Sequence, residues 1–265
     1  MKLKQYQIDA FANKVFEGNP AAVCPLDDWL ADDLMQAIAA ENNLAETAFF
    51  VQEGDDYRIR WFTPKAEVDL CGHATLASAF VLFNELAYQG STITFNSRSG
   101  PLIVAQNHDY FEMDFPNEKP RPCELPFNIA EALGLDDDQV HQCFLGGDLI
   151  VQLTSEHAVF EAQPNLAQIS QINARGLIIT AASSKYDFVN RCFFPNLGID
   201  EDPVTGSAFT QLVPMWAEQL NQTQFDAKQV SQRGGEVFCS LQGDRVVLKR
   251  ASELVYASRN NAVSN

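Results

Sequence analysis

Two stretches in opposite halves of the chain place side chains suited to acid/base chemistry beside a glycine-led helix start. They are Cys71-Gly72-His73-Ala74-Thr75-Leu76 and Asp202-Pro203-Val204-Thr205-Gly206-Ser207-Ala208. Each follows an acidic, turn-forming stretch and opens an apolar run, which is typical of a loop that leads into a helix. A helix start presents unpaired backbone N–H groups and the positive end of the helix dipole, which favour a carboxylate or a developing oxyanion. Because the two starts lie half a chain length apart, we expect a duplication whose two helix ends converge on one ligand.

Glu46 is the first candidate for the acid/base group. It stands where the polar segment Asn42-Asn43 gives way to the aromatic, apolar run that ends in Phe49-Phe50. Hydrophobic neighbours would desolvate the carboxylate and raise its pKa, which makes it a competent proton acceptor and donor near neutral pH. The alternative is an exposed glutamate at a strand edge or cap.

His73 is the second candidate, in the first turn of the first helix. The positive helix end disfavours a charged imidazole, so we expect a neutral ring that donates a hydrogen bond or relays a proton. The alternative is a histidine with a purely structural role. Cys71, two residues earlier, also suggests a nucleophilic thiol, since a helix N-terminus lowers a thiol pKa.

Asp202 precedes the second glycine-led turn. The functional hypothesis has it bind a substrate amine or orient His73 across a cleft, and the alternative is that it caps the turn. The Ser207 hydroxyl and the nearby backbone N–H groups would hold an anionic group.

Strand patterns dominate both halves and surround a few helices. A helix is expected at residues 32–41, and an almost wholly apolar one at 74–86 should be wrapped inside its domain. The second half repeats this order, with an apolar helix at 208–220 that Pro214 should kink or end early. Strands are expected at 5–10, 47–52, 57–63, 91–96, 102–106, 110–115, 149–153, 176–181, 188–194, 235–241, 245–249 and 254–257, and shorter helices at 129–133 and 166–172.

These elements predict an α+β fold of two similar lobes, each a curled mixed sheet around a central apolar helix. Four prolines in residues 115–127 break helix and central strand alike and mark the boundary. We therefore expect an N-terminal lobe of residues 1–118 and a C-terminal lobe of 119–265, and we leave open that the last strand crosses back to the N-terminal lobe. The active cleft would lie between the lobes.

Composition excludes several classes of function. The net charge of −17 argues against binding to nucleic acid or to an anionic membrane, because both need a concentrated basic surface. The first residues lack the apolar core of a secretory signal, and no run approaches the ~20 apolar residues of a membrane span. We expect a cytoplasmic protein. Its six scattered cysteines predict free thiols and no structural zinc site.

Motifs in both halves resemble the PhzF-type phenazine biosynthesis isomerase family, whose lobes resemble those of diaminopimelate epimerase. The matching stretches are Gly18-Asn19-Pro20-Ala21-Ala22-Val23, Asn43-Leu44-Ala45-Glu46-Thr47-Ala48-Phe49, Asp69-Leu70-Cys71-Gly72-His73-Ala74-Thr75-Leu76, and Arg191-Cys192-Phe193-Phe194-Pro195 with Gly198-Ile199-Asp200-Glu201-Asp202-Pro203-Val204-Thr205-Gly206-Ser207-Ala208. The resemblance covers essentially the whole chain.

The resemblance implies an isomerase without a cofactor or metal that acts on a small carboxylate-bearing substrate. Glu46 matches the family's acid/base glutamate, and His73 and Asp202 fall beside the substrate as catalytic groups. The substrate contacts would be Asn19, Gly72, Gly206 and Ser207. The family resemblance also implies a homodimer.

Two alternatives remain open. Epimerases of the related fold use two cysteines, one before each glycine-led helix, whereas this chain has Cys71 at the first position and Thr205 at the second. A two-thiol racemase is therefore disfavoured, and a single carboxylate that removes and returns the proton fits better. A racemase or epimerase that pairs Cys71 with another group is the first alternative. A noncatalytic binder of small acids is the second.

Overall fold

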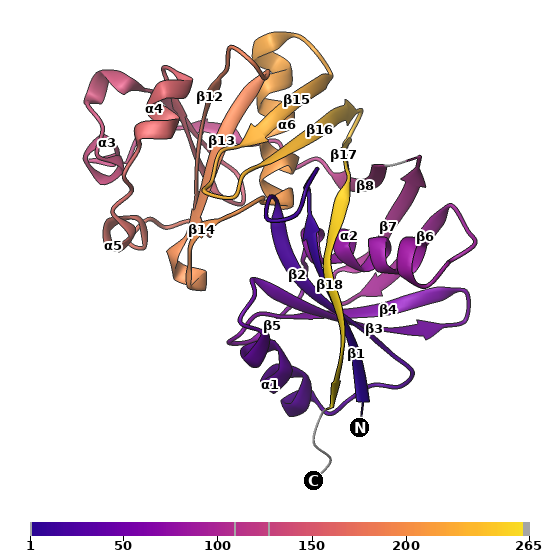
Figure 1. Ribbon diagram of the computed structural model, residues 1–265. Coiled ribbons are helices and arrows are strands. Elements are labelled where there is room, and N and C mark those ends of the chain that lie inside the picture. Colours follow the sequence, from indigo (N-terminus) through magenta and orange to yellow (C-terminus); the bar gives the residue numbers. More distant parts are fainter. Residues whose placement is uncertain (1, 109, 127, 262–265) are drawn as a thin grey trace. The chain divides into compact units, whose positions relative to one another are not determined.

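The computed structural model describes residues 2–108, 110–126 and 128–261. The chain forms two compact units, which we call the N-terminal unit (residues 1–114 with 249–265) and the C-terminal unit (residues 115–248). Figure 1 shows the yellow C-terminal strand beside the first strand of the chain. The last strand therefore belongs to the N-terminal unit.

The N-terminal unit is a curled mixed sheet around helix α2. The helix contacts β1, β2 and β3 as well as β7 and β18, so strands from distant parts of the sheet meet it. Seven of its nine residues are buried, in keeping with its apolar sequence. The elements are β1 (Lys2–Ala10), β2 (Asn19–Leu26), α1 (Asp32–Asn42), β3 (Glu46–Glu53), β4 (Asp56–Phe62), β5 (Glu67–Val68), α2 (Gly72–Phe80), η1 (Val81–Glu85), β6 (Thr92–Ser97), β7 (Gly100–Asn107), β8 (Tyr110–Pro116) and β18 (Ser252–Asn261).

The C-terminal unit has the same kind of sheet and its own apolar helix, α6. Ten residues of α6 are buried, from its first turn to Trp216. The elements are β9 (Arg121–Cys123), α3 (Ile129–Leu133), η2 (Asp137–Gln139), β10 (Val140–Leu145), β11 (Leu149–Leu153), α4 (Glu156–Glu161), α5 (Leu166–Ile169), β12 (Leu177–Ala182), β13 (Phe188–Phe194), η3 (Pro195–Leu197), β14 (Ile199–Asp202), α6 (Gly206–Leu220), β15 (Gln224–Gln229), β16 (Gly235–Gln242) and β17 (Arg245–Arg250).

Strand pairing repeats between the units. In the N-terminal unit β1–β2 is antiparallel, β2–β3 parallel, β3–β4 antiparallel, β4–β6 parallel and β6–β7 antiparallel. In the C-terminal unit the pairs β10–β11, β11–β12, β12–β13, β13–β15 and β15–β16 follow the same sequence of directions. Helices α2 and α6 each lie between the fourth and fifth strands of this order. The expected α+β fold of two similar lobes is confirmed.

Helix α6 excludes one of the two outcomes expected at Pro214, the early end. The helix does not end early but continues through Pro214 to Leu220. Proline lacks the N–H that would bond the carbonyl of Thr210, one turn earlier. That carbonyl accepts a hydrogen bond from the Glu118 backbone N–H at 3.1 Å instead. The segment before β9 therefore supplies the bond that the proline removes.

The proline-rich segment also contains a strand that its composition did not predict. Strand β9 includes Pro122 and pairs with β10. A proline is tolerated there because β9 is only three residues long. Among the described residues, no helix has the length and apolar character to cross a membrane.

The core of the C-terminal unit around Phe188 generates a stability prediction. Phe188 is buried, stacks on Trp216 with ring centroids 5.7 Å apart, and touches Phe209 and Phe225. Phe188→Ala should lower the free energy of unfolding by about 3–5 kcal/mol, measured by urea denaturation, because it leaves a cavity. The control Phe160→Ala removes a ring that is 55% exposed and should change it by about 0.5 kcal/mol or less. Equal effects would contradict this account of the core.

Candidate active site

Glu46 lies at the first position of β3, in the interior of the N-terminal sheet. Helix α1 ends at Asn42, and the left-handed conformation of the next residue, Asn43 (φ 48°), turns the chain toward the strand. The Asn42 side chain donates a hydrogen bond to the Thr47 hydroxyl at 3.0 Å and so ties the helix end to the strand start. Glu46 then pairs in parallel register with Ala21 of β2. Only 8% of the residue is exposed, so the exposed-edge alternative is wrong.

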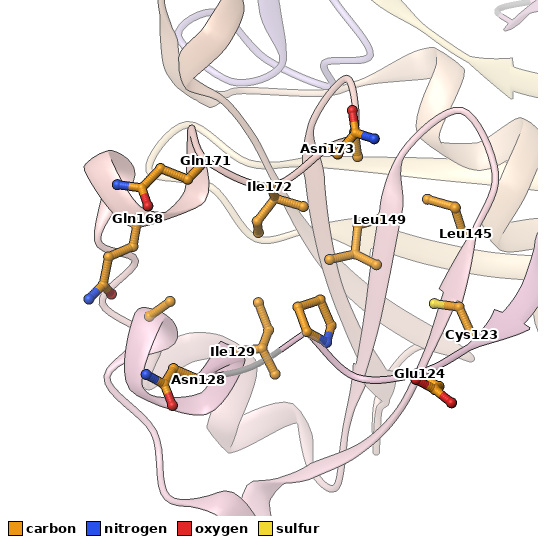
Figure 2. Close-up of a pocket in the computed structure, with 13 residues that line it drawn as sticks. Cys123, Glu124, Asn128, Ile129, Leu145, Leu149, Gln168, Gln171, Ile172 and Asn173 are labelled. Atoms are coloured by element: carbon orange, nitrogen blue, oxygen red, sulfur yellow. The ribbon is translucent and has the colours of Figure 1, made fainter.

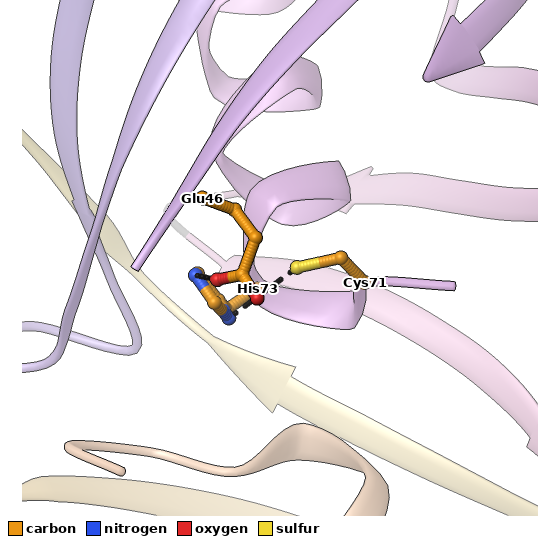
Figure 3. A group of neighbouring side chains, drawn as sticks. All are labelled: Glu46, Cys71 and His73. Carbon is orange, nitrogen blue, oxygen red and sulfur yellow. Dashed lines mark hydrogen bonds and ion pairs between the residues drawn. The ribbon is translucent and has the colours of Figure 1, made fainter. Parts of the chain in front are cut away.

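His73 faces Glu46 from the first turn of α2 (Figure 3). The Nε2 atom of the ring lies 3.1 Å from Oε2 of the carboxylate, within ion-pair range. The two atoms are not aligned for a hydrogen bond, and neither has another hydrogen-bond partner among the described residues. Both groups therefore keep unused hydrogen-bonding capacity in a buried place.

Cys71 completes the cluster on the other side of the ring. Its Sγ lies 3.6 Å from Nδ1 of His73 (Figure 3). Burial and the charge of Glu46 raise the pKa of the Cys71 thiol, contrary to the lowering expected at a helix start. A neutral thiol is a weak nucleophile, so the geometry does not favour the thiol hypothesis.

The charge state expected for His73 is also corrected. Burial opposes a charged ring, but the neighbouring thiol and carboxylate outweigh it and raise the pKa of His73 well above 6.5. Because the thiol is neutral near pH 7, Glu46 is the group that supplies the charge. The helix dipole predicted a neutral ring, and the closer carboxylate reverses that prediction.

Glu46, Cys71 and His73 have donor atoms within 4.8 Å of one another, and we tested whether they could hold a metal ion. The thiol faces Nδ1 of the imidazole, whereas the carboxylate faces Nε2. One ion can bond only one nitrogen of a given ring, so the three donors do not converge on a single point. The arrangement suits proton transfer along a line better than metal binding.

Two predicted substrate contacts lie in the same unit. Gly72 is the first residue of α2, directly before His73. Asn19 is fully buried at the start of β2, two residues before the partner of Glu46, so alternation along the strand puts Asn19 and Ala21 on one face.

Asp202 and Ser207 lie in the C-terminal unit, on either side of the start of α6. The hydroxyl of Thr205 donates to Oδ2 of Asp202 at 2.5 Å. Buried Gln229 also binds this turn, donating to the Asp202 carbonyl at 2.7 Å and accepting from the Thr205 N–H at 2.8 Å. Asp202 thus stabilises the turn before Gly206, as its capping alternative predicted, and this contact leaves the catalytic hypothesis untested.

Sequence reasoning missed a polar network that contacts Ser207. Arg175 donates twice to the fully buried Asp148 carboxylate and donates from Nη2 to Ser207 Oγ at 3.2 Å. Gln211, one turn after Ser207 on α6, also donates to Asp148 at 2.8 Å. These residues are far apart in sequence, and no local motif marks them. The only available signal was a lone Asp beside the glycine pair 146–147.

The structure therefore brings Glu46 and His73 into contact, with Gly72 and Asn19 in the same unit. It gathers Asp202, Gly206 and Ser207 around the start of α6 in the other unit. The result is a repeated α+β scaffold in which one helix start carries a buried carboxylate–imidazole pair. At the other helix start, Asp202 and Ser207 accept hydrogen bonds from Thr205 and Arg175.

Comparisons with known proteins agree with this class of scaffold. Residues 8–255 match the family model described as phenazine biosynthesis-like protein, PhzC-PhzF. A Pseudomonas aeruginosa protein named an uncharacterized isomerase is 47% identical over 254 residues, covering 96% of this chain and 97% of that protein. The crystal structure of a PhzF-family phenazine biosynthesis protein from Enterococcus faecalis superimposes with a TM-score of 0.96 and 44% identity, covering 99% and 100% of the two chains.

The chain belongs to the PhzF family of phenazine biosynthesis-like proteins. The expected isomerase class is confirmed at the level of the family, in which relatives carry that name. A hydroxyproline epimerase from Agrobacterium vitis shares 7% identity at a TM-score of 0.62 over 97% of this chain and 92% of its own, which shows a common fold alone.

The charge pair makes a prediction about pH. The pKa of His73 in the folded protein lies above 6.5. The charged imidazole therefore contributes its full stabilisation below pH 6.5, and this stabilisation is lost as the pH rises through the pKa of the folded protein. Glu46→Gln removes the charge but keeps the burial, so the pKa of His73 should fall. NMR titration of the imidazole C–H signals measures this, with the other histidines as references. A His73 titration unchanged by the substitution would show that the carboxylate is not the cause.

Proposed function

We propose that the protein is a cofactor-independent isomerase that transfers a proton on a small carboxylate-bearing substrate, with Glu46 as the acid/base group. The supporting observation is the buried Glu46–His73 pair, 3.1 Å apart and not aligned for a hydrogen bond. A pair that only held the fold together would be expected to satisfy these buried atoms. Here a substrate can form hydrogen bonds with both Glu46 and His73.

Proton transfer would proceed through one carboxylate. Ionised Glu46 takes a proton from a carbon next to a carbonyl or carboxyl group, which leaves an enolate-like anion and a neutral carboxylic acid. The acid then returns the proton to another carbon of the conjugated system on the same face, and the double bond moves. The imidazolium of His73 would stabilise the negative charge that develops. The same carboxylate removes and returns the proton, so the reaction needs no second acid/base group.

The C-terminal unit would supply binding groups. We propose that Gly206 and Ser207 at the start of α6, together with Gly72 and Asn19 of the N-terminal unit, hold the carboxylate and the developing charge. Asp202 would bind an amine of the substrate or orient His73. The proposal requires both units to bind the same molecule. We also propose a homodimer, from the family resemblance, and a cytoplasmic location, from the sequence.

Two other functions have specific tests. A racemase that uses Cys71 needs a thiolate, which the raised pKa of this thiol disfavours; retained activity of Cys71→Ala would exclude it. A noncatalytic binder of small acids would bind carboxylates but transfer no deuterium from solvent to a carbon of its ligand.

Glu46→Gln provides the direct test of the proposed base. The wild-type protein, incubated in deuterated water with a panel of small amino and hydroxy acids, should introduce carbon-bound deuterium that mass spectrometry detects. Glu46→Gln should abolish the incorporation and leave ligand binding largely intact, because the amide keeps the size and polarity of the side chain but cannot take up a proton.

The matched control is Glu53→Gln, the same change at the exposed end of the same strand. It should incorporate deuterium at the wild-type rate. Incorporation by Glu46→Gln at that rate would exclude Glu46 as the base.

Arg175→Lys tests whether the network at α6 positions Ser207. Lysine keeps the charge beside Asp148 but cannot reproduce the paired contacts and also reach Ser207. With a substrate found in the panel, KM should rise about tenfold and kcat should change by about twofold or less, as expected for loss of one charged hydrogen bond in binding.

Two controls separate positioning from folding. Arg191→Lys disturbs an equivalent arginine that binds Glu201 and two backbone carbonyls; it should leave KM unchanged. In a Ser207→Ala background, Arg175→Lys should add no further increase in KM. A full additional increase there would show that Arg175 does not act through Ser207.

A further inference from the structure

Two cysteines of the C-terminal unit face each other across a strand pair. Strand β9 runs antiparallel to β10, and Cys123 is the direct partner of Cys143. Directly opposed residues in an antiparallel pair have Cα atoms about 4.5–5.5 Å apart, which falls within the range that a disulfide spans. The backbone register therefore already permits a bond between them.

The side chains of the two cysteines are also in contact. The two Sγ atoms lie 3.1 Å apart, and the Cys143 thiol also contacts the Cys123 carbonyl at 3.1 Å. A disulfide bond is about 2.05 Å long, so the sulfurs need to approach by only about 1 Å. Among the described residues, no other two cysteine sulfurs are in such contact, and all six thiols are free.

The two thiols differ in access. Cys143 is buried, and burial followed by the contact with Cys123 raises its pKa to about 12. Cys123 is half-buried and lines a cavity of about 560 Å³ between the start of α3, the loop after α5 and the end of β10. In Figure 2 its sulfur points toward this cavity, near Leu145 and Leu149. A small oxidant can therefore reach Cys123 first.

We propose that Cys123 and Cys143 are a redox modification site that closes to a reversible intramolecular disulfide. The oxidant is a peroxide or a low-molecular-weight disulfide. With hydrogen peroxide, the Cys123 sulfur attacks one oxygen, the O–O bond breaks, and a sulfenic acid and one water form. The Cys143 sulfur then displaces the sulfenic oxygen as a second water, with formation of the S–S bond. Two thiols lose two electrons and two protons, and a thiol reductant reverses the reaction.

Closure would join the wall of the cavity to the sheet. The bond would link residues 20 positions apart and enclose α3 and η2 in a covalent loop. Cross-linking a loop of this size restricts the unfolded chain, so the oxidised protein should melt at a higher temperature, by roughly 5 °C.

The experiment treats the full chain with oxidised glutathione and then alkylates it under denaturing conditions. The wild type should retain four alkylatable thiols of its six, be two hydrogen atoms lighter than the reduced protein, and yield a linked peptide that contains residues 123 and 143. Dithiothreitol should restore all six. Cys143→Ser should instead stop at a glutathione adduct on Cys123, because no second sulfur displaces the glutathione.

The control is Cys239→Ser, which removes a buried thiol without a neighbouring sulfur. It should form the 123–143 link as the wild type does. Circular dichroism confirms that each variant is folded. The proposal is overturned by a wild type that keeps six free thiols, that links other cysteines, or that stops at the glutathione adduct. None of these results bears on proton transfer at Glu46, so the two proposals fail separately.

Discussion

The contact between the Glu46 carboxylate and the His73 imidazole is the interaction on which the candidate site depends. Removing two charges from water is costly, and their attraction compensates for this only when the geometry is good and the remaining polar atoms are satisfied. Here Oε2 and Nε2 are close but misaligned, and both lack hydrogen-bond partners among the described residues. The surrounding structure must therefore hold the pair in place. The tie from Asn42 to Thr47 fixes the start of β3, and the apolar wrapping of α2 fixes the ring.

The two units share a strand order but differ in the residues at their helix starts. The same order of parallel and antiparallel pairs surrounds α2 and α6, yet the helix starts carry different groups. The first has a carboxylate, an imidazole and a thiol within a few ångströms. At the second, Asp202 accepts a short hydrogen bond from Thr205, and Arg175 binds Ser207. The N-terminal unit thus has titrating groups with unused hydrogen-bonding atoms. In the C-terminal unit the polar groups at the helix start are already hydrogen-bonded.

Local sequence patterns predicted the parts of the fold that depend on local physics. Helix α1 follows from apolar periodicity, and helices α2 and α6 follow from apolar runs after a glycine-led start. Glu46 and His73 follow from their places beside an apolar strand and helix. Strands β2 and β15 were missed because Pro20 and Pro25 interrupt the first and polar residues dominate the second. The Asp148–Arg175–Gln211 network joins residues 27 and 63 positions apart, so only the tertiary structure brings it together. The charge of His73 was mispredicted for the same reason, since a distant carboxylate in the sequence is its nearest charge in space.

The same contact distinguishes carboxylate chemistry from thiol chemistry at the first helix start. An ionised Glu46 raises the pKa of Cys71, because two negative charges so close in a buried site repel each other. A site can therefore keep either a carboxylate or a thiolate ready at neutral pH, and this arrangement favours the carboxylate. In the proposed mechanism Glu46 alone transfers the proton, so no second thiol is needed, and Thr205 donates a hydrogen bond to Asp202. The retained Cys71 then acts as a neutral neighbour of Nδ1 that helps to fix the ring.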